Sequence, residues 1–258
     1  MEKGRLSRSF DIIGEIAIVK FEGKLSKKEK ITSVKDLLEK NKNVKKIFEK
    51  TGMIQGKERL PELKSIIGKG SLTLYRENGC AFYVDVKKVF FSPRMSNERL
   101  RVIGKIREGE KVLDMFCGVG PFAIPAAKKA MKVSAIDINK DAISLLKKNI
   151  KLNKISNIDV YCGDSNKITE KMDAKFDRVI MNFPLYAYKF LDTAVKKCND
   201  SAAIHLYSFV KDGKTASIKK DIKEKCGRHF KHVRIEDYSA GEVAPFLERH
   251  CFDILLKR

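Results

Sequence analysis

The chain has 258 residues, 43% of them hydrophobic, which suffices for one large domain or two modest ones with a real core. It has no apolar run of transmembrane length and no apolar segment behind its charged N-terminus, so we expect a cytoplasmic protein without membrane helix or signal peptide. Lys and Arg number 54 against 33 Asp and Glu, a net charge of +21 that favours a nucleic-acid partner. The alternative is a lysine-rich, solvated surface.

The first 92 residues predict a small α+β unit. A helix is expected over 33–50, where apolar residues recur at helical spacing, and 24–30 is expected to be a charged connector. The expected strands are 10–22 with a bulge at Gly14, 71–76, 81–86 and 90–92. Glu77-Asn-Gly79 between two of them is a strong hairpin signal. Residues 53–70 show little periodicity.

From residue 93 onward, strands and helices alternate. Helices are expected at 93–106, 121–129, 140–152 (capped by Asn139), 165–171, 187–198 and 215–230. Strands are expected at 111–116, 132–136, 158–162, 177–181, 202–209, 232–238 and 251–256. This alternation predicts a doubly wound α/β domain with a mainly parallel sheet. The last two strands have no helix between them, which predicts an antiparallel hairpin at the sheet edge.

Cysteine and histidine usage argues against a metal site. The six cysteines are scattered without a Cys-x-x-Cys pair, so we expect them to be reduced and mostly in the core. Of the four histidines, only His229 and His232 have ligand-like spacing, and they fall in a basic segment expected to be exposed. We therefore expect neither a disulfide framework nor a bound metal.

A glycine turn follows the first strand of the α/β domain. Asp114 ends the strand, Gly118 and Gly120 follow, and Pro121 opens a helix. The glycines let a ligand approach the backbone beyond the carboxyl end of the strand. Asp114 and the bulky Pro121-Phe122 suit a cationic ligand better than a diphosphate. S-adenosylmethionine carries a sulfonium and an ammonium, and the loop resembles motif I of the class I methyltransferases. The alternative is a turn that serves chain geometry alone.

Three more strand ends should converge on the same crevice. Asp137 is placed to accept the ribose hydroxyls of a nucleoside, and Asp164 to meet an adenine amino group. Asn182-Phe-Pro184 resembles the Asn/Asp-Pro-Pro-Tyr motif of amino-methylating enzymes, and its carboxamide can read a base edge. Each acid alone could be a helix cap, but the ordered set indicates S-adenosylmethionine. The residues expected to bind it are Asp114, Phe116, Gly118, Gly120, Asp137, Ile138, Asp164, Ser165 and Asn182.

Four segments together resemble the archaeal and eukaryotic tRNA guanine-N1 methyltransferases. They are residues 76–86, 89–99, 114–122 and 179–184, with Phe-Ser-Pro-Arg and Asn-x-Pro as the specific motifs. The resemblance implies a class I S-adenosylmethionine-dependent methyltransferase domain over 93–258, with a Rossmann-like sheet and an antiparallel edge hairpin. It also implies an α+β domain over 1–92 that binds RNA and completes the active site. The implied activity is methyl transfer to N1 of guanosine 37 in the tRNA anticodon loop, by a monomer that needs no metal.

The resemblance also implies roles for individual residues. Glu98 corresponds to the general base that takes the N1 proton, Arg59 to the residue that stabilises charge on O6, and Asn182 to the one that holds guanine. Arg99 corresponds to a cofactor-side residue. A carboxylate can act as such a base when burial raises its pKa. The alternatives are that Glu98 pairs with Arg94 or Arg101 on the helix surface, and that Arg59 contacts a phosphate.

The chain departs from the family in two ways. The family commonly has an additional N-terminal domain, whereas this chain begins where the middle domain begins, and Phe183 stands where Leu is usual. The second-ranked function is a wyosine-pathway tRNA enzyme on the same fold, which transfers an aminocarboxypropyl group or methylates a tricyclic guanine. A non-catalytic RNA-binding module and a nicotinamide-dependent enzyme are the alternatives from other classes.

Overall fold

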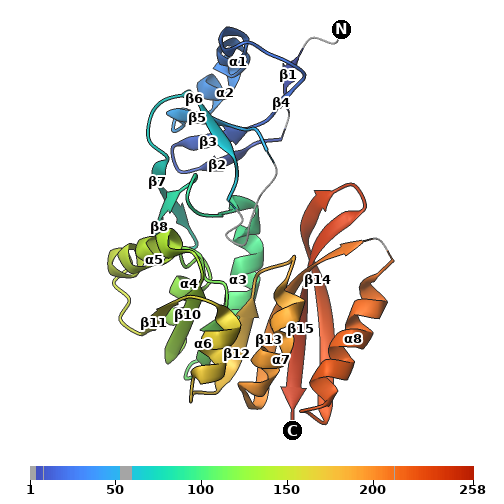
Figure 1. The fold of residues 1–258 in the computed structure, drawn as a ribbon. Coiled ribbons are helices and arrows are strands. Elements are labelled where there is room, and N and C mark those ends of the chain that lie inside the picture. Colours follow the sequence, from blue (N-terminus) through green and yellow to red (C-terminus); the bar gives the residue numbers. More distant parts are fainter. Residues whose placement is uncertain (1–3, 8, 53–59, 212) are drawn as a thin grey trace.

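The computed structural model describes residues 4–7, 9–52, 60–211 and 213–258. Figure 1 shows a smaller N-terminal part above a larger α/β part. In the described ranges, no helix is long and apolar enough to cross a membrane.

The N-terminal part is built on a four-stranded sheet in the order β2-β3-β5-β6. Its strands are β2 (Asp11–Ile13), β3 (Ile16–Val19), β5 (Lys46–Lys50) and β6 (Leu63–Ile67). A small pair, β1 (Arg5–Leu6) and β4 (Phe21–Glu22), and two helices, α1 (Lys27–Ser33) and α2 (Lys35–Lys40), complete it. Buried residues from sheet and helices form a separate apolar core: Ala17, Val19, Val34, Leu37, Val44, Ile47 and Ile66.

Several predictions for this part were wrong. The expected helix over 33–50 is broken: α1 ends at Ser33, α2 spans only Lys35–Lys40, and Lys46–Lys50 is strand β5. Ile47 and Phe48 have helical spacing relative to Val44. However, β5 pairs with β3 on one side and β6 on the other, and this buries Ile47, Phe48 and Glu49 in succession. Strand pairing therefore overrides the local pattern.

The neighbouring segments also differ from the prediction. The single strand expected over 10–22 turns at Gly14, whose φ is +57°, and becomes an antiparallel pair. The segment 24–30, expected to be a charged connector, is helical from Lys27 onward because Ser26 and Glu29 form a capping box at the start of α1. Leu63–Ile67 is a strand where no periodicity was seen, and residues 90–92 are not a strand.

The larger part contains the predicted doubly wound sheet, with strand order β11-β10-β9-β12-β13-β15-β14. The strands are β9 (Lys111–Asp114), β10 (Lys132–Asp137), β11 (Ile158–Cys162), β12 (Phe176–Met181), β13 (Cys198–Lys211), β14 (His232–Ala244) and β15 (Leu247–Lys257). The first five are parallel, and β15 runs antiparallel between β13 and β14, so the predicted edge hairpin is confirmed.

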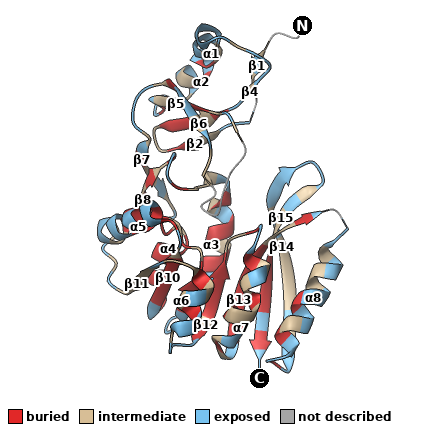
Figure 2. Ribbon diagram, in the orientation of Figure 1, coloured by how far each residue is buried: buried red, intermediate tan, exposed pale blue. Residues whose placement is uncertain are grey.

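Helices cover both faces of this sheet and form two cores. They are α3 (Ser96–Gly104), α4 (Ala123–Ala127), α5 (Lys140–Leu152), α6 (Ser165–Lys171), α7 (Leu191–Lys196) and α8 (Thr215–Gly227), with short 3₁₀ turns η1 (Pro93–Met95) and η2 (Ala187–Phe190). Side chains of α3, α4 and α5 join one core, whereas those of α7 and α8 join the other. Figure 2 shows the burial concentrated in the central strands. The Asn139 cap is confirmed, since its side chain accepts from the N–H groups of Asp141 and Ala142.

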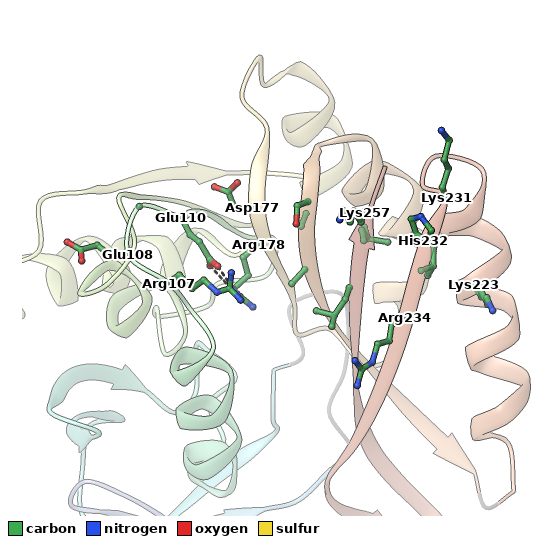
Figure 3. A pocket seen from close by; sticks show the side chains of 17 residues that line it. Arg107, Glu108, Glu110, Asp177, Arg178, Lys223, Lys231, His232, Arg234 and Lys257 are labelled. Atoms are coloured by element: carbon green, nitrogen blue, oxygen red, sulfur yellow. Dashed lines mark hydrogen bonds and ion pairs between the residues drawn. The ribbon is translucent and has the colours of Figure 1, made fainter.

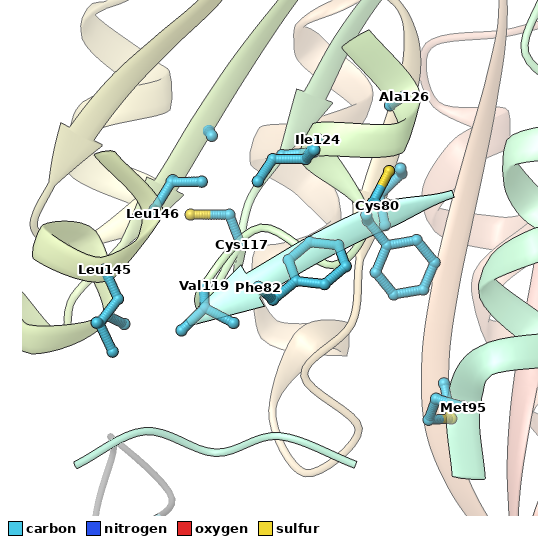
Figure 4. Close-up of a cluster of buried hydrophobic side chains, with 14 of the residues drawn as sticks. Cys80, Phe82, Met95, Cys117, Val119, Ile124, Ala126, Leu145 and Leu146 are labelled. Atoms are coloured by element: carbon cyan, nitrogen blue, oxygen red, sulfur yellow. The ribbon is translucent and has the colours of Figure 1, made fainter. Parts of the chain in front are cut away.

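The hairpin of β7 (Leu72–Glu77) and β8 (Cys80–Asp85) packs against α5. Its predicted turn is confirmed: Asn78 and Gly79 have φ of +48° and +69°. Asn149 of α5 bonds both backbone groups of Tyr83, at 2.7 and 3.2 Å. Phe82 and Cys80 enter the core that contains side chains of α3, α4 and α5 (Figure 4). A domain boundary after residue 92 stays a prediction, and this packing favours one before β7.

Candidate functional site

A cavity of about 610 Å³ lies at the carboxyl ends of β9 to β12, beside the glycine turn. We call it the glycine-loop cavity. It brings together eight of the residues predicted for the site: Arg99, Phe116, Gly118, Asp137, Ile138, Asp164, Ser165 and Asn182. Asp114, Gly120 and Glu98 do not line it, and Arg59 lies outside the described residues.

The two glycines of the turn serve different purposes. Gly118 has a φ of +52°, and a Cβ there would meet nothing within 4 Å, because the residue faces the open cavity. Gly120 has a φ of +94°, and a Cβ there would lie 2.5 Å from Leu146 Cδ1 of α5. Gly118 therefore leaves room for a ligand, whereas Gly120 lets α5 pack closely against the turn.

The acids at the second and third strand ends hold the backbone around the cavity. Asp137 Oδ2 accepts from the Gly118 N–H at 2.7 Å, and Oδ1 accepts from the Asn139 N–H at 2.9 Å. Asp164 caps α6 by accepting from the Lys167 N–H at 3.1 Å. The helix-cap alternative is therefore real for Asp164, although both acids also line the cavity.

Asp114 lies behind the turn rather than in the cavity. It is fully buried, and its Oδ1 accepts from the Phe116 N–H at 3.3 Å. Among the described side chains, its Oδ2 is one of the few buried oxygens without a hydrogen-bond partner. Burial raises the pKa of Asp114 to about 7, and the nearby Asp137 charge acts in the same direction. A cation approaching the turn would stabilise the ionised form.

Glu98 is buried on α3, with both carboxylate oxygens occupied. Arg101 donates to Oε2 at 2.7 Å and to Oε1 at 2.8 Å, and the Tyr207 hydroxyl donates to Oε1 at 2.8 Å. Two ion pairs were considered for Glu98. The one with Arg101 is present, whereas Arg94 pairs with Asp11 at 2.6 Å instead. Glu98 does not line the cavity, but Met95 and Arg99 beside it do.

Arg99 connects the β7–β8 hairpin to this site. Its guanidinium is only 3% exposed and pairs with Glu77 through two nitrogens, and it also donates to the Ser92 carbonyl at 3.1 Å. Arg99 is also part of the cavity wall. A buried ion pair of this kind fixes the orientation of the arginine.

Aromatic rings form the remaining wall around Asn182. Phe183, at the position where Leu is usual, packs on Phe116 with a ring-centroid distance of 5.0 Å, and Phe190 contacts Phe116 at the same distance. Tyr186 lines the cavity and is 43% exposed, whereas Tyr188 does not line it and packs against the core that contains α7 and α8. Of these two tyrosines, only Tyr186 is placed to meet a ligand in the cavity.

Sequence reasoning missed several wall residues. Phe90 and Phe91 line the cavity from a loop that was expected to be a strand. Leu185 and Lys189 follow the Asn182 motif, but neither carries a distinctive signal. The Pro at 93 does not set this loop apart from a strand, because it disfavours only helical backbone in the residue before it.

A larger cavity of about 960 Å³ lies at the opposite edge of the sheet, near the amino ends of β9 and β12 (Figure 3). We call it the far-edge cavity. Its charged lining comprises Arg107, Glu108, Glu110, Asp177, Arg178, Lys223, Lys231, Arg234 and Lys257. Arg178 and Glu110 point toward each other and form an ion pair at 2.7 Å (Figure 3).

A buried polar network runs from Arg178 toward Glu98. Arg178 Nη1 donates to His205 Nε2 at 2.7 Å, so His205 Nδ1 carries the proton and donates to Asp253 at 2.6 Å. Burial lowers the pKa of His205. His205, Cys251 and Asp253 lie close enough to hold a metal, but Arg178 already occupies the imidazole and Arg101 and Lys105 the carboxylate. The cluster offers no open ligand set.

Comparison with known families identifies both parts of the chain. Residues 73–235 match the TRM5/TYW2 methyltransferase domain, and residues 1–71 match the TYW2 N-terminal domain.

Two relatives illustrate the range within this similarity. The chain is 46% identical over 209 residues to tRNA (guanine(37)-N(1))-methyltransferase Trm5b of Pyrococcus abyssi, covering 81% of this chain and 62% of the relative. It is 38% identical over 200 residues to tRNA(Phe) (4-demethylwyosine(37)-C(7)) aminocarboxypropyltransferase of Methanocaldococcus jannaschii, covering 77% of each. The chain thus spans less than two thirds of the first of these.

Solved structures agree with the fold. A complex of aTrm5 with tRNALeu superposes with a TM-score of 0.86 at 35% identity, covering 98% of this chain and 73% of that one. M. jannaschii TYW2 in complex with AdoMet superposes with a TM-score of 0.70 at 26% identity, covering 97% of this chain and 100% of that one.

Proposed function

This chain belongs to the TRM5/TYW2 methyltransferase family, and on that premise we propose that it methylates N1 of guanosine 37 in the tRNA anticodon loop with S-adenosylmethionine. The observation that carries the proposal is the glycine-loop cavity. It joins the turn at Gly118, the strand-end carboxylate of Asp137 and the carboxamide of Asn182 in one space.

The residues present fit the cofactor. Gly118 leaves open space for it, and Asp137 and Asp164 offer carboxylates toward a nucleoside. A cationic group above the orphaned Asp114 oxygen would favour the ionised form of this carboxyl and be stabilised by its charge. When bound, the sulfonium supplies an already activated methyl group, so no metal is needed to activate it. The aromatic wall of Phe116, Phe183 and Phe190 excludes water from this end of the cavity.

The chain's own residues would position guanine and move its proton. In this proposal Asn182 hydrogen-bonds the guanine edge at the cavity wall, and Glu98 takes the N1 proton. Arg101 and Tyr207 hold Glu98 as an acceptor, but they also occupy its oxygens. These three contacts leave one acceptor position of the carboxylate, and Glu98 does not line the cavity, so guanine binding must bring N1 and this position together. Arg59 remains the proposed partner of O6.

The proposed partner is tRNA. The net charge of +21 and the related aTrm5–tRNALeu complex support an RNA substrate. We place the enzyme in the cytoplasm as a monomer that works without a metal ion. Occupation of the His205–Cys251–Asp253 cluster by Arg178, Arg101 and Lys105 supports the last point.

A second candidate is aminocarboxypropyl transfer from the same cofactor. It is favoured by the match of residues 1–71 to the TYW2 N-terminal domain and by the 38% identical aminocarboxypropyltransferase. The two reactions break different bonds to the same sulfonium, so the position of an isotope in the cofactor distinguishes them.

The test uses two substrates and two labelled cofactors. One substrate is an unmodified tRNA transcript with guanosine 37, and the other is a tRNA that carries 4-demethylwyosine at position 37, the base named for the related aminocarboxypropyltransferase. One cofactor carries tritium in the methyl group and the other carbon-14 in the carboxyl group. We expect only the methyl label to appear in tRNA, as N1-methylguanosine at position 37. Transfer of the carboxyl label would favour the second candidate, and N1-methylation at another position would overturn the proposal.

Asn182→Ala tests the named residue in the same assay. It should lower the methylation rate about a hundredfold, because the guanine edge loses the side chain that hydrogen-bonds it and is left unpaired in the site. The matched control is Asn199→Ala, whose side chain bonds Asp177 away from the glycine-loop cavity. Equal rates in both variants would remove Asn182 from the mechanism.

A further inference from the structure

The β14–β15 hairpin extends to the same side of the sheet as the glycine-loop cavity (Figure 1). Leu247 at the start of β15 pairs with Lys211, the last residue of parallel strand β13, and with Ala244 at the end of β14. The hairpin tip therefore lies at the carboxyl ends of the parallel strands. Arg249 lies two residues along β15 from this end and pairs across the ladder with Phe209.

The Arg249 guanidinium lies directly outside the cavity. Its Nη1 is 2.9 Å from the sulfur of Met95, which belongs to the cavity wall, and the guanidinium lies 5.8 Å from the centre of the Phe209 ring. Arg249 itself does not line the cavity. Met95 therefore separates the Arg249 guanidinium from a ligand held wholly inside the cavity. Because Arg249 is partly exposed, a chain that lies across the outside of this wall can reach it.

Within the described ranges, no carboxylate forms an ion pair with Arg249, although the side chain is partly buried. Burial lowers the pKa of Arg249, and the charge of nearby Arg99 lowers it further. A thioether is a weak acceptor and uses one of five guanidinium donors. A desolvated cation without an anionic partner is costly for the fold.

The other partly or fully buried arginines around α3 are treated differently. Arg99 pairs with Glu77, Arg101 with Glu98 and Asp253, and Arg178 with Glu110. The chain provides a carboxylate for each of these three arginines, but among the described residues it provides none for Arg249. The contact of Arg249 with the wall of the glycine-loop cavity points to an anion that a ligand supplies.

We propose that Arg249 binds a backbone phosphate of the RNA where the strand crosses the mouth of the glycine-loop cavity. The planar guanidinium fork matches two phosphate oxygens, and a phosphate is fixed there whatever the base sequence. This inference rests on the proposed tRNA substrate. It assigns Arg249 to holding the strand while the target base enters the cavity.

The experiment measures binding of unmodified tRNA to the full chain and to three variants, Arg249→Gln, Arg249→Lys and Arg107→Gln. Arg107 is exposed at the far edge, so its variant removes the same charge away from the cavity. Arg249→Gln should weaken tRNA binding about tenfold. It should also reduce the slope of the logarithm of the binding constant against the logarithm of the salt concentration by about 0.7, the value for loss of one contact to a single-strand phosphate. Arg249→Lys should retain most of the affinity.

A chemical change in the RNA makes the test specific. Single methylphosphonate linkages, which lack the charge, are placed in turn along the anticodon loop of an otherwise identical tRNA. One linkage should weaken binding to the unsubstituted protein about tenfold and leave binding to Arg249→Gln unchanged. Cofactor affinity by calorimetry should not differ between the variants, and the thermal midpoint of Arg249→Gln should be equal to or above that of the parent, since the change removes a costly buried cation.

Four outcomes would overturn the inference. Equal losses in Arg249→Gln and Arg107→Gln would indicate bulk charge, and lost cofactor affinity would indicate the cofactor carboxylate. A lower kcat with unchanged RNA affinity and salt slope would indicate that Arg249 stabilises charge on the base during methyl transfer. A lower thermal midpoint would indicate packing. Because binding is measured without turnover, a protein that binds tRNA but forms no N1-methylguanosine refutes the proposed function without refuting the Arg249 contact.

Discussion

The two cavities at opposite edges of the seven-stranded sheet differ in what lines them. The glycine-loop cavity, about 610 Å³, is walled by aromatic rings, a glycine turn and polar groups at strand ends. The far-edge cavity, about 960 Å³, is larger and lined by more Lys and Arg. Its most buried cation, Arg178, is already paired with Glu110 and bonded to His205.

This difference shows that volume and charge do not by themselves make a reaction site. Parallel strands direct their carboxyl ends, and the loops that follow them, toward one edge, and ligands bind there. Side chains at the other edge join strands and helices together. Variants at the two edges should therefore divide into those that alter ligand binding and those that alter stability.

The largest effect is expected from Arg178→Met at the far edge. It would leave Glu110 and the Lys105 carbonyl without their donor, so the free energy of unfolding should fall by about 5 kcal/mol. Cofactor affinity of the folded protein should not change. Urea unfolding and calorimetry check this, with exposed Arg107→Met, expected within about 0.5 kcal/mol of the parent, as the control. A loss of cofactor affinity at full stability would mean that the far edge takes part in ligand binding.

Asp114→Asn should change how stability depends on pH. Asp114 binds a proton in the folded state up to about pH 7, whereas in the unfolded chain its pKa is near the ordinary 3.8. The stabilisation from this proton is full below about pH 4 and is lost as the pH rises through 7, a total of about 4 kcal/mol. The free energy of unfolding of Asp114→Asn should not show this fall.

The measurement is urea unfolding of the parent and of Asp114→Asn at several pH values between 4 and 8. Asp159→Asn, which removes an exposed carboxylate, controls for the change of charge. A constant difference between parent and Asp114→Asn across this range would show that Asp114 is ionised throughout.

The two glycines of the turn should separate stability from binding. Gly120→Ala should lower the free energy of unfolding by about 3 kcal/mol, because the new methyl group meets Leu146 in a left-handed backbone conformation. Gly118→Ala should cost only about 1 kcal/mol but weaken cofactor binding at least tenfold, since its Cβ occupies open cavity. Thermal melts and calorimetry give both values. Equal cofactor affinity in Gly118→Ala and the parent would exclude a close backbone approach by the ligand.

The smallest effects are expected from Lys223→Ala and Lys231→Ala in the far-edge cavity. Their cofactor affinity and methylation rate should stay within about twofold of the parent, because neither side chain reaches the glycine-loop cavity. Filter binding of tRNA extends the test. A tenfold loss of tRNA affinity in either variant would make the far edge part of the RNA-binding surface and would break the comparison between the two edges.

The prediction from sequence worked best where the signal is local. Helix α5, with its Asn139 cap and regular apolar spacing, and the Asn78-Gly79 turn follow from residues a few positions apart. The strand-end acids were also found, because the alternation of strands and helices fixes which ends face the same edge. It failed at β5, where pairing with β3 and β6 overrides a helical pattern.

The sequence by itself determined the α/β alternation, the glycine turn and eight of the residues that line its cavity, since each depends on short-range spacing. Only the tertiary structure decided which partner each charged residue takes. It placed Asp114 behind the turn, gave Glu98 to Arg101 and Tyr207, and left Arg249 without a carboxylate among the described residues. These outcomes depend on contacts between residues far apart in the chain, such as Glu98 and Tyr207, whose proximity no local pattern encodes.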